Sequence, residues 1–332
     1  MKKFEKYIIA VALILTLLSG CKRQTLYQIE TTTSSARVGV SVDWEEANME
    51  RDEINNISIY AYAEGGAEPY VKVSGDIDYG YIDLPEGLYT ILVFSDFVGD
   101  IQGVQFGDQA LFDQFYVQAI QTYQGGLYYD LEQGEILAET IGRIAAWHTT
   151  ELEVSPDMLW CSCCDPSPEI VTQVELVAQP TPLTTLCTVA LSVENLDNAA
   201  YIEVVVRGLA VGALMAGGGR FESSEGQLLY LLTLDQRNYS SDTDGVVSGS
   251  VVTFGKPTAI DSQSYTLNIE IVLNSGEQLS YERDVTSQVE EQDNIEIVIS
   301  LSGEDDKITL PASTASGFGV EDWGDNEQVY LL

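Results

Sequence analysis

The residues best suited to chemistry are the five cysteines, and Cys21 has the most telling surroundings. It follows a lysine-rich start, an apolar run at 7–18, and the small residues Ser19 and Gly20. This order is typical of a secretory signal, and the run is shorter than the roughly 20 residues of a spanning helix. Leu-Ser-Gly-Cys is a lipobox, in which the cysteine thiol receives diacylglycerol. We therefore expect residues 1–20 to be a signal peptide and Cys21 to be the lipid attachment site.

The other four cysteines surround a proline-rich stretch: Cys161, Cys163, Cys164 and Cys187. An exported chain meets an oxidising environment, which favours disulfides among them. Free thiols and a metal site are the alternatives, since four thiolates can complete a tetrahedron around zinc. The adjacent pair Cys163 and Cys164 cannot easily face one ion, so disulfides are the preferred interpretation. Their pairing does not follow from the sequence.

Catalytic motifs are not evident. His148 is the single histidine, it follows Trp147, and no G-x-S-x-G sequence occurs, which leaves little basis for a nucleophile and base pair. Asp242-Thr243-Asp244-Gly245 resembles the start of a calcium loop but has Thr253 at the twelfth position, so a hairpin tip is expected there. The sequence thus predicts no enzyme activity, no cofactor and no metal.

Charge and composition narrow the class of partner. The formal net charge is −37 and apolar residues make up 45% of the 332 residues. Such a charge repels nucleic acid and anionic membrane surfaces, whereas cations or basic proteins are compatible with it. The apolar fraction is sufficient for a core in each of two domains.

Alternating apolar residues, the pattern of half-buried strands, dominate the remaining sequence. The clearest runs are 38–44, 57–61, 89–93, 189–193, 202–206, 265–273 and 295–301, with a hairpin turn at Asn274-Ser275-Gly276. Leu111, Phe115 and Ala119 permit one short helix, and the apolar residues at 137, 141 and 144 permit another. We expect an all-β chain of two tandem β-sandwich domains.

Prolines and polar stretches suggest where the domains end. Residues 21–36 are rich in Ser and Thr and predict a flexible tether. We expect an N-terminal sandwich at 37–155, a Pro- and Cys-rich junction at 156–180, and a C-terminal sandwich within 170–303. Residues 304–332 are expected to be a tail whose last residues form a final strand.

Several short motifs, in order along the chain, are similar to those of a known family. They are the lipobox at Cys21, the sequence 84–89 leading into a strand, 156–160, 252–255 followed by Gly276 and 284–289, and Gly317-Phe318 with Asp322-Trp323-Gly324. Together they resemble the fimbrillin-like lipoproteins of Gram-negative anaerobes, a family of unknown function related to Mfa-like and FimB-like fimbrial anchor and accessory subunits. The cysteine cluster has no counterpart in that pattern.

The resemblance implies tandem sandwiches of fimbrillin or transthyretin-like, Greek-key type, and no catalysis. In related pilins a protease frees an N-terminal strand and subunits join by strand donation, so Arg37 is a possible processing site. The resemblance favours a fimbrial anchor or accessory subunit with pilin-like partners, held on the cell envelope, in the outer membrane, by lipid on Cys21. The alternative is a glycan-binding lipoprotein of a nutrient-uptake system. Tyr79, Tyr81, Tyr128 and Tyr129 are candidates for a sugar platform, but tyrosine is also a good strand residue, and filling of strands or core is the preferred interpretation of these four residues.

Overall fold

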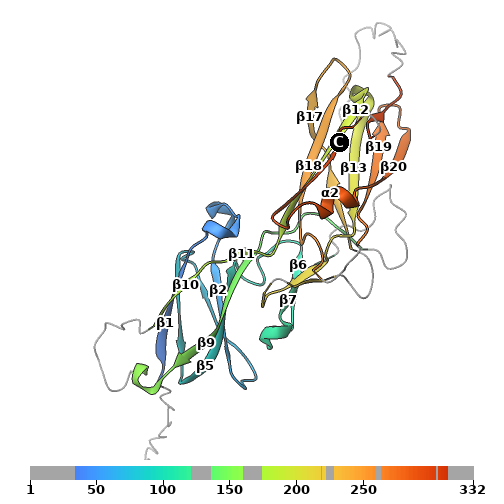
Figure 1. The fold of residues 1–332 in the computed structure, drawn as a ribbon. Coiled ribbons are helices and arrows are strands. Elements are labelled where there is room, and N and C mark those ends of the chain that lie inside the picture. The colour runs from blue at the N-terminus through green and yellow to red at the C-terminus, as the bar shows by residue number, and fades with distance from the viewer. Residues whose placement is uncertain are drawn as a thin grey trace, which may run out of the picture.

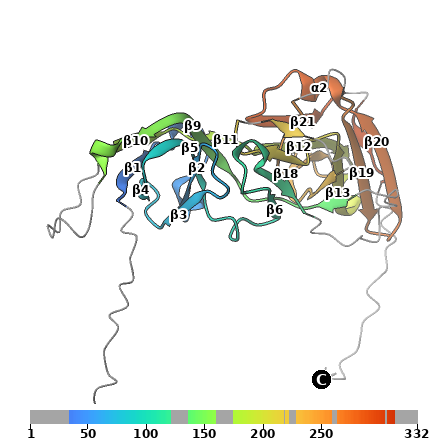
Figure 2. The same cartoon turned by 90° about the horizontal axis from the view of Figure 1, so that it is seen from below.

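A computed structural model describes residues 34–120, 136–159, 174–217, 219–221, 228–258, 263–303 and 306–312. Strands account for nearly all of its regular structure, and two groups of them lie side by side (Figures 1 and 2). The described helical pieces are one α-helix and five single 3-10 turns: α2 (Thr286–Glu290), η1 (Glu45–Ala47), η2 (Arg51–Glu53), η3 (Phe112–Gln114), η4 (Pro156–Met158) and η5 (Leu196–Asn198). The all-β expectation with tandem sandwiches is confirmed.

The first sandwich consists of two sheets, which we call the β1 sheet and the β5 sheet. The β1 sheet has the order β10-β1-β4 and the β5 sheet has the order β11-β9-β5-β2-β3. Their strands are β1 (Ala36–Val42), β2 (Ile57–Ala63), β3 (Tyr70–Ser74), β4 (Tyr79–Leu84), β5 (Gly87–Ser95), β9 (Ala145–Val154), β10 (Val174–Ala178) and β11 (Thr181–Pro182). Thus β10 and β11, which follow the proline-rich stretch, pair back onto the first half of the chain.

Both faces of the β5 sheet are covered. Ile59 and Ile91 belong to the core between the β1 and β5 sheets, whereas Tyr60 and Phe94 belong to a second core that continues into the C-terminal half. Strands buried on both faces need apolar residues at successive positions, not at alternate ones. This explains why nearly every residue of β2, and every residue of β5 from Ile91 to Ser95, is buried.

The second sandwich consists of the β12 sheet, in the order β17-β18-β12-β21 with β22 also on β12, and the β13 sheet, in the order β20-β19-β13-β16-β8. Its strands are β8 (Ile136–Ala138), β12 (Thr185–Glu194), β13 (Ala199–Arg207), β16 (Leu228–Thr233), β17 (Gln236–Tyr239), β18 (Gly245–Thr253), β19 (Thr266–Leu273), β20 (Gln278–Asp284), β21 (Glu296–Leu301) and β22 (Ile308–Thr309). β12 alternates strictly between buried and half-buried residues. The expected hairpins occur at 274–276, between β19 and β20, and at 240–244, between β17 and β18.

A small joint sheet lies between the two sandwiches (Figure 1). Its order is β15-β14-β7-β6, with β6 (Val104–Gly107), β7 (Tyr116–Ala119), β14 (Gly212–Leu214) and β15 (Arg220–Phe221). β7 and β14 come from different halves of the chain and pair antiparallel, so the halves share backbone hydrogen bonds as well as a core.

Neither expected short helix forms. At the first position one 3-10 turn is followed by β7, because Phe115, Val117 and Ala119 are buried at period two. At the second position β8 leads into extended chain, in which Gly142 donates its backbone hydrogen bond to Gln102 of another segment. In both places tertiary pairing outweighs a weak helical spacing.

Candidate functional site

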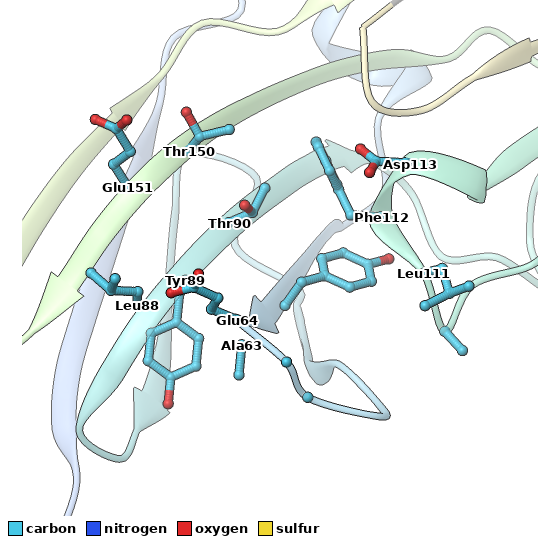
Figure 3. A pocket seen from close by; sticks show the side chains of 14 residues that line it. Ala63, Glu64, Leu88, Tyr89, Thr90, Leu111, Phe112, Asp113, Thr150 and Glu151 are labelled. Atoms are coloured by element: carbon cyan, nitrogen blue, oxygen red, sulfur yellow. The ribbon is translucent and has the colours of Figure 1, made fainter.

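One cleft lies on the β5 sheet, on the face that carries Tyr60 and Phe94. The joint sheet and Phe115 cover that face on the side toward the second sandwich. Where this cover ends, a cleft of about 680 Å³ opens between β2, β5, β9 and the η3 segment (Figure 3). We call it the sheet-face cleft. Its lining residues are Tyr62, Ala63, Glu64, Gly65, Gly66, Leu88, Tyr89, Thr90, Ala110, Leu111, Phe112, Asp113, Thr150 and Glu151.

Aromatic packing sets the position of the η3 segment against the sheet. The ring of Phe112 lies 5.6 Å from that of Tyr62 and 5.4 Å from that of His148, centroid to centroid. The hydroxyl of Tyr62 donates a hydrogen bond of 3.0 Å to the backbone oxygen of Gln109. Burial raises the pKa of Tyr62, so this hydroxyl remains a proton donor. The wall of the cleft is therefore fixed by packing and by a partly buried hydrogen bond.

A β-bulge shapes the opposite wall. The pairing of β5 with β9 shifts between Tyr89 and Ile91, so Thr150 and Glu151 together oppose Thr90. Glu151 has φ +72°, a left-handed conformation that is uncommon for residues other than glycine. Bulges re-aim side chains, and strained residues of this kind cluster at functional sites.

Three exposed carboxylates surround the cleft: Glu64, Asp113 and Glu151. Figure 3 shows Glu151 and Asp113 on opposite sides, with Thr90 and Phe112 between them. In the described part of the chain no lysine or arginine forms an ion pair with these three residues. Leu88 and Leu111, which are 46% and 48% exposed, add apolar surface to the rim. An acidic rim beside apolar side chains suits a partner surface that carries basic and apolar residues.

Within the described residues the cleft has no arrangement for catalysis. Its polar side chains are carboxylates and the hydroxyls of threonines and tyrosines, and His148 packs against Phe112 of the lining. In the same part of the chain no three His, Cys, Asp or Glu side chains are grouped to hold a metal ion.

Arg37 lies inside β1, between β10 and β4. Its guanidinium donates hydrogen bonds of 2.8 Å and 3.0 Å to the two carboxylate oxygens of Asp83. It also lies 3.9 Å from the centre of the Tyr81 ring. The hydrogen bonds to Asp83 raise the pKa of Arg37. The expected processing residue is therefore part of a paired strand and of a bidentate ion pair.

The cysteines divide into two groups. Cys21 and the cluster Cys161, Cys163 and Cys164 lie outside the described residues, so lipid attachment and disulfides remain predictions. Cys187 lies on β12 as a free and fully buried thiol. Burial raises its pKa to about 12, which keeps it protonated and unreactive at neutral pH.

The expected sugar platforms are only partly described. Tyr79 and Tyr81 are half-buried on β4, and the Tyr81 ring is contacted by Arg37 and by Lys72 at 5.1 Å. Tyr128 and Tyr129 lie outside the described residues. The sheet-face cleft was not predicted from the sequence. The adjacent glycines Gly65 and Gly66, which favour a turn, are the local signal beside it.

Comparison with known proteins gives the family. A family model described as a domain of unknown function, DUF5119, matches residues 20–229, which is more than half of the chain. The chain belongs to the DUF5119 family. No curated protein matches it in sequence.

Solved structures with low sequence identity to this chain share its fold. The chain resembles the crystal structure of a candidate adhesin from Bacteroides ovatus, with TM-score 0.57, 13% identity, and coverage of 83% of this chain and 93% of that one. A candidate adhesin from Bacteroides thetaiotaomicron matches with TM-score 0.50, 9% identity, and coverage of 80% and 90%. The fimbrial anchor protein Mfa2 from Porphyromonas gingivalis also matches, at TM-score 0.43, 14% identity, and coverage of 82% and 94%. The expected membership of a family of unknown function is confirmed by the family match, and the expected fold is that of the candidate adhesin structures.

Among the described residues no helix has the length and apolar character needed to cross a membrane.

Proposed function

We propose that this DUF5119 protein is a lipid-anchored, non-enzymatic protein of the cell envelope that acts as a fimbrial anchor or accessory subunit. Lipid on Cys21 holds it on the outer membrane, and β-strand contacts bind pilin-like subunits. Support comes from the lipobox, from the fold shared with candidate adhesins, and from the acidic and apolar rim of the sheet-face cleft.

The observation that carries the proposal is an apolar edge strand beside the sheet-face cleft. β3 is the last strand of the β5 sheet in the described part of the chain. Val71 and Val73 on it are 48% and 38% exposed, and they oppose Tyr60 and Ser58 in register. Proteins usually protect such edges with charges or prolines, and β3 has one lysine, Lys72. An extended segment of another subunit can add to this edge by β-augmentation.

The setting of Arg37 favours an anchor or accessory role over that of a shaft subunit. In a shaft subunit, assembly by strand donation would require a protease to cut the chain first, and Arg37 is the predicted site of that cut. Here β1 is paired along both edges, and Arg37 is tied to Asp83. An anchor needs no such cleavage and keeps the lipid that tethers it.

The test is a pull-down of C-terminally tagged protein from detergent-solubilised membranes, with partners identified by mass spectrometry. Wild type should recover pilin-like subunits. The double variant Val71→Lys and Val73→Lys should lose them, because two charges at the edge oppose strand addition. Val177→Lys is the matched control, since Val177 is a 63% exposed valine on the edge strand β10.

Three outcomes are informative. If the β3 double variant recovered as much of the pilin-like subunits as wild type does, the contact would not be made by β3. Recovery of transport or glycan-processing proteins in place of pilins would favour the nutrient-uptake alternative. Cys21→Ala should move the protein from the membrane fraction to the soluble fraction, and unchanged retention would contradict the lipid anchor.

A further inference from the structure

The second sandwich contains a buried carboxylate without an opposite charge. Glu203 on β13 is only 6% exposed. Its Oε1 accepts a hydrogen bond from the hydroxyl of Tyr201, whereas its Oε2 has no hydrogen-bond partner. Across the described ranges no ion pair reaches Glu203. An ionised carboxylate in such a place is costly unless a cation or several donors compensate it.

A second carboxylate, on the neighbouring strand β19, adds electrostatic repulsion to the cost of burying Glu203. In the register of β13 and β19, Glu203 lies directly opposite Glu270. Residues opposite each other share a face of the sheet, and like charges in these positions destabilise it. On the other side, toward β16, Glu203 is opposite Thr233. The strands around Glu203 thus supply oxygen atoms and negative charge.

Glu203 lines a separate cleft of about 370 Å³ between β13, β16 and β18. The hydroxyl of Tyr201 links Glu203 to Thr233, whose Oγ1 is 3.1 Å from it. The polar side chains of the cleft all carry oxygen: Glu139, Glu203, Thr140, Tyr201, Thr233 and Ser250. Neither a nitrogen nor a sulfur ligand is among the described residues that line it.

We propose that this cleft binds a hard divalent cation of the calcium class, with the Oε2 of Glu203 as its central ligand. Calcium takes six to eight oxygen ligands in irregular geometry and retains water, which the open side of the cleft admits. A bound cation would compensate Glu203 and weaken its repulsion by Glu270. Because two carboxylates line the cleft, we expect weak binding, in the range of about 10⁻⁴ to 10⁻³ M found for extracellular modules.

The probe is terbium, which occupies calcium sites and emits when a nearby tyrosine transfers energy to it. The purified full-length protein should give terbium emission through Tyr201, and added calcium should suppress it. Calcium at millimolar concentration should also raise the Tm by a few degrees, because it binds the folded state. Absence of both effects in the wild type would overturn the proposal.

Matched variants locate the ion. Glu203→Gln keeps the shape of the side chain and should weaken calcium binding about tenfold or more. Thr233→Val removes one hydroxyl and should weaken it to a smaller extent, which provides a second variant if Glu203→Gln folds poorly. Glu282→Gln, an exposed glutamate on β20 in the same sheet, should change neither readout. An unchanged calcium response in Glu203→Gln would place the ion elsewhere among the 52 acidic residues and overturn the site.

Discussion

At the residue scale, Arg37 shows how local packing controls access to a peptide bond. Its side chain is only 19% exposed and is held by Asp83 and Tyr81. A protease must bind an extended segment in its own active site, so β1 has to separate from its neighbours before the bond after Arg37 can be cut.

We therefore expect trypsin to cut slowly after Arg37, as followed by N-terminal sequencing of the products. Asp83→Asn removes the bidentate partner, and a loss of about 1 kcal/mol would increase cleavage about fivefold. Asp78→Asn is the control, since its ion pair with Arg51 is more than half exposed and belongs to a different arginine. Rapid cutting of wild-type protein at this bond would revive the shaft-subunit interpretation.

Buried weak acids make a second residue-scale prediction. Burial raises the pKa of Cys187 from 9.0 to about 12 and that of Tyr89 from 10.0 to about 12. These groups ionise in the unfolded chain first, so their contribution to stability is complete below about pH 9 and is lost as pH rises toward 12.

We expect the midpoint of urea unfolding to fall steadily above about pH 9. Cys187→Ala should flatten part of this decline, even if it lowers stability at neutral pH by leaving a small cavity. The thiol of native Cys187 should also resist alkylation at pH 8. Rapid alkylation of Cys187 in the folded protein would contradict this prediction, because it would require β12 to separate frequently from its neighbouring strands.

At the element scale, the joint sheet depends on a close backbone approach. Gly212 on β14 pairs with Gln118 on β7. A Cβ added at Gly212 would lie 2.4 Å from the backbone oxygen of Val117 and 2.7 Å from the ring of Phe221. Only glycine fits there, because one of the clashing atoms is main chain.

Gly212→Ala should therefore destabilise the protein by about 1–3 kcal/mol, measured by chemical denaturation. Gly75→Ala is the control, since nothing lies within 4 Å of its added Cβ. The control should stay within about 0.5 kcal/mol of wild type. Equal stability of the two variants would mean that β14 and β7 separate at little cost.

Secondary-structure elements could be predicted from the sequence where interactions between neighbouring residues define them, and not where contacts between distant segments do. Strands exposed on one face, such as β12, β19 and β21, show period two in the sequence and were anticipated. The short helix that the spacing of Leu111, Phe115 and Ala119 permitted does not form. Leu111 is 48% exposed, whereas Val117, which has no place in the helical spacing, is buried. Short apolar runs do not distinguish helix from strand until their partners are known.

At the scale of the whole molecule, one core joins the two halves. It extends from Tyr60, Phe94 and Phe115 in the first half to Val204 and Ile269 in the second. Phe94 is fully buried, and its ring centroid lies 5.5 Å from that of Tyr60 and 5.9 Å from that of Phe115. A shared core favours unfolding as a single unit.

Phe94→Ala should cost about 3–5 kcal/mol and lower the Tm while leaving a single calorimetric transition. Ile59→Ala, in the core between the β1 and β5 sheets, should act on the same transition. Two separate transitions, of which Phe94→Ala shifts only one, would contradict the shared core.

The sequence by itself predicts the signal peptide and the lipobox, and it determined the all-β class and most strands exposed on one face, because each depends on neighbouring residues. It contained no sign that β1 pairs in parallel with β10, that β7 pairs with β14, or that the β5 sheet is covered on both faces. Those features arise from contacts between segments far apart in the chain. The sheet-face cleft and the burial of Glu203 follow from them, since a side chain's exposure is set by which distant strands lie over it.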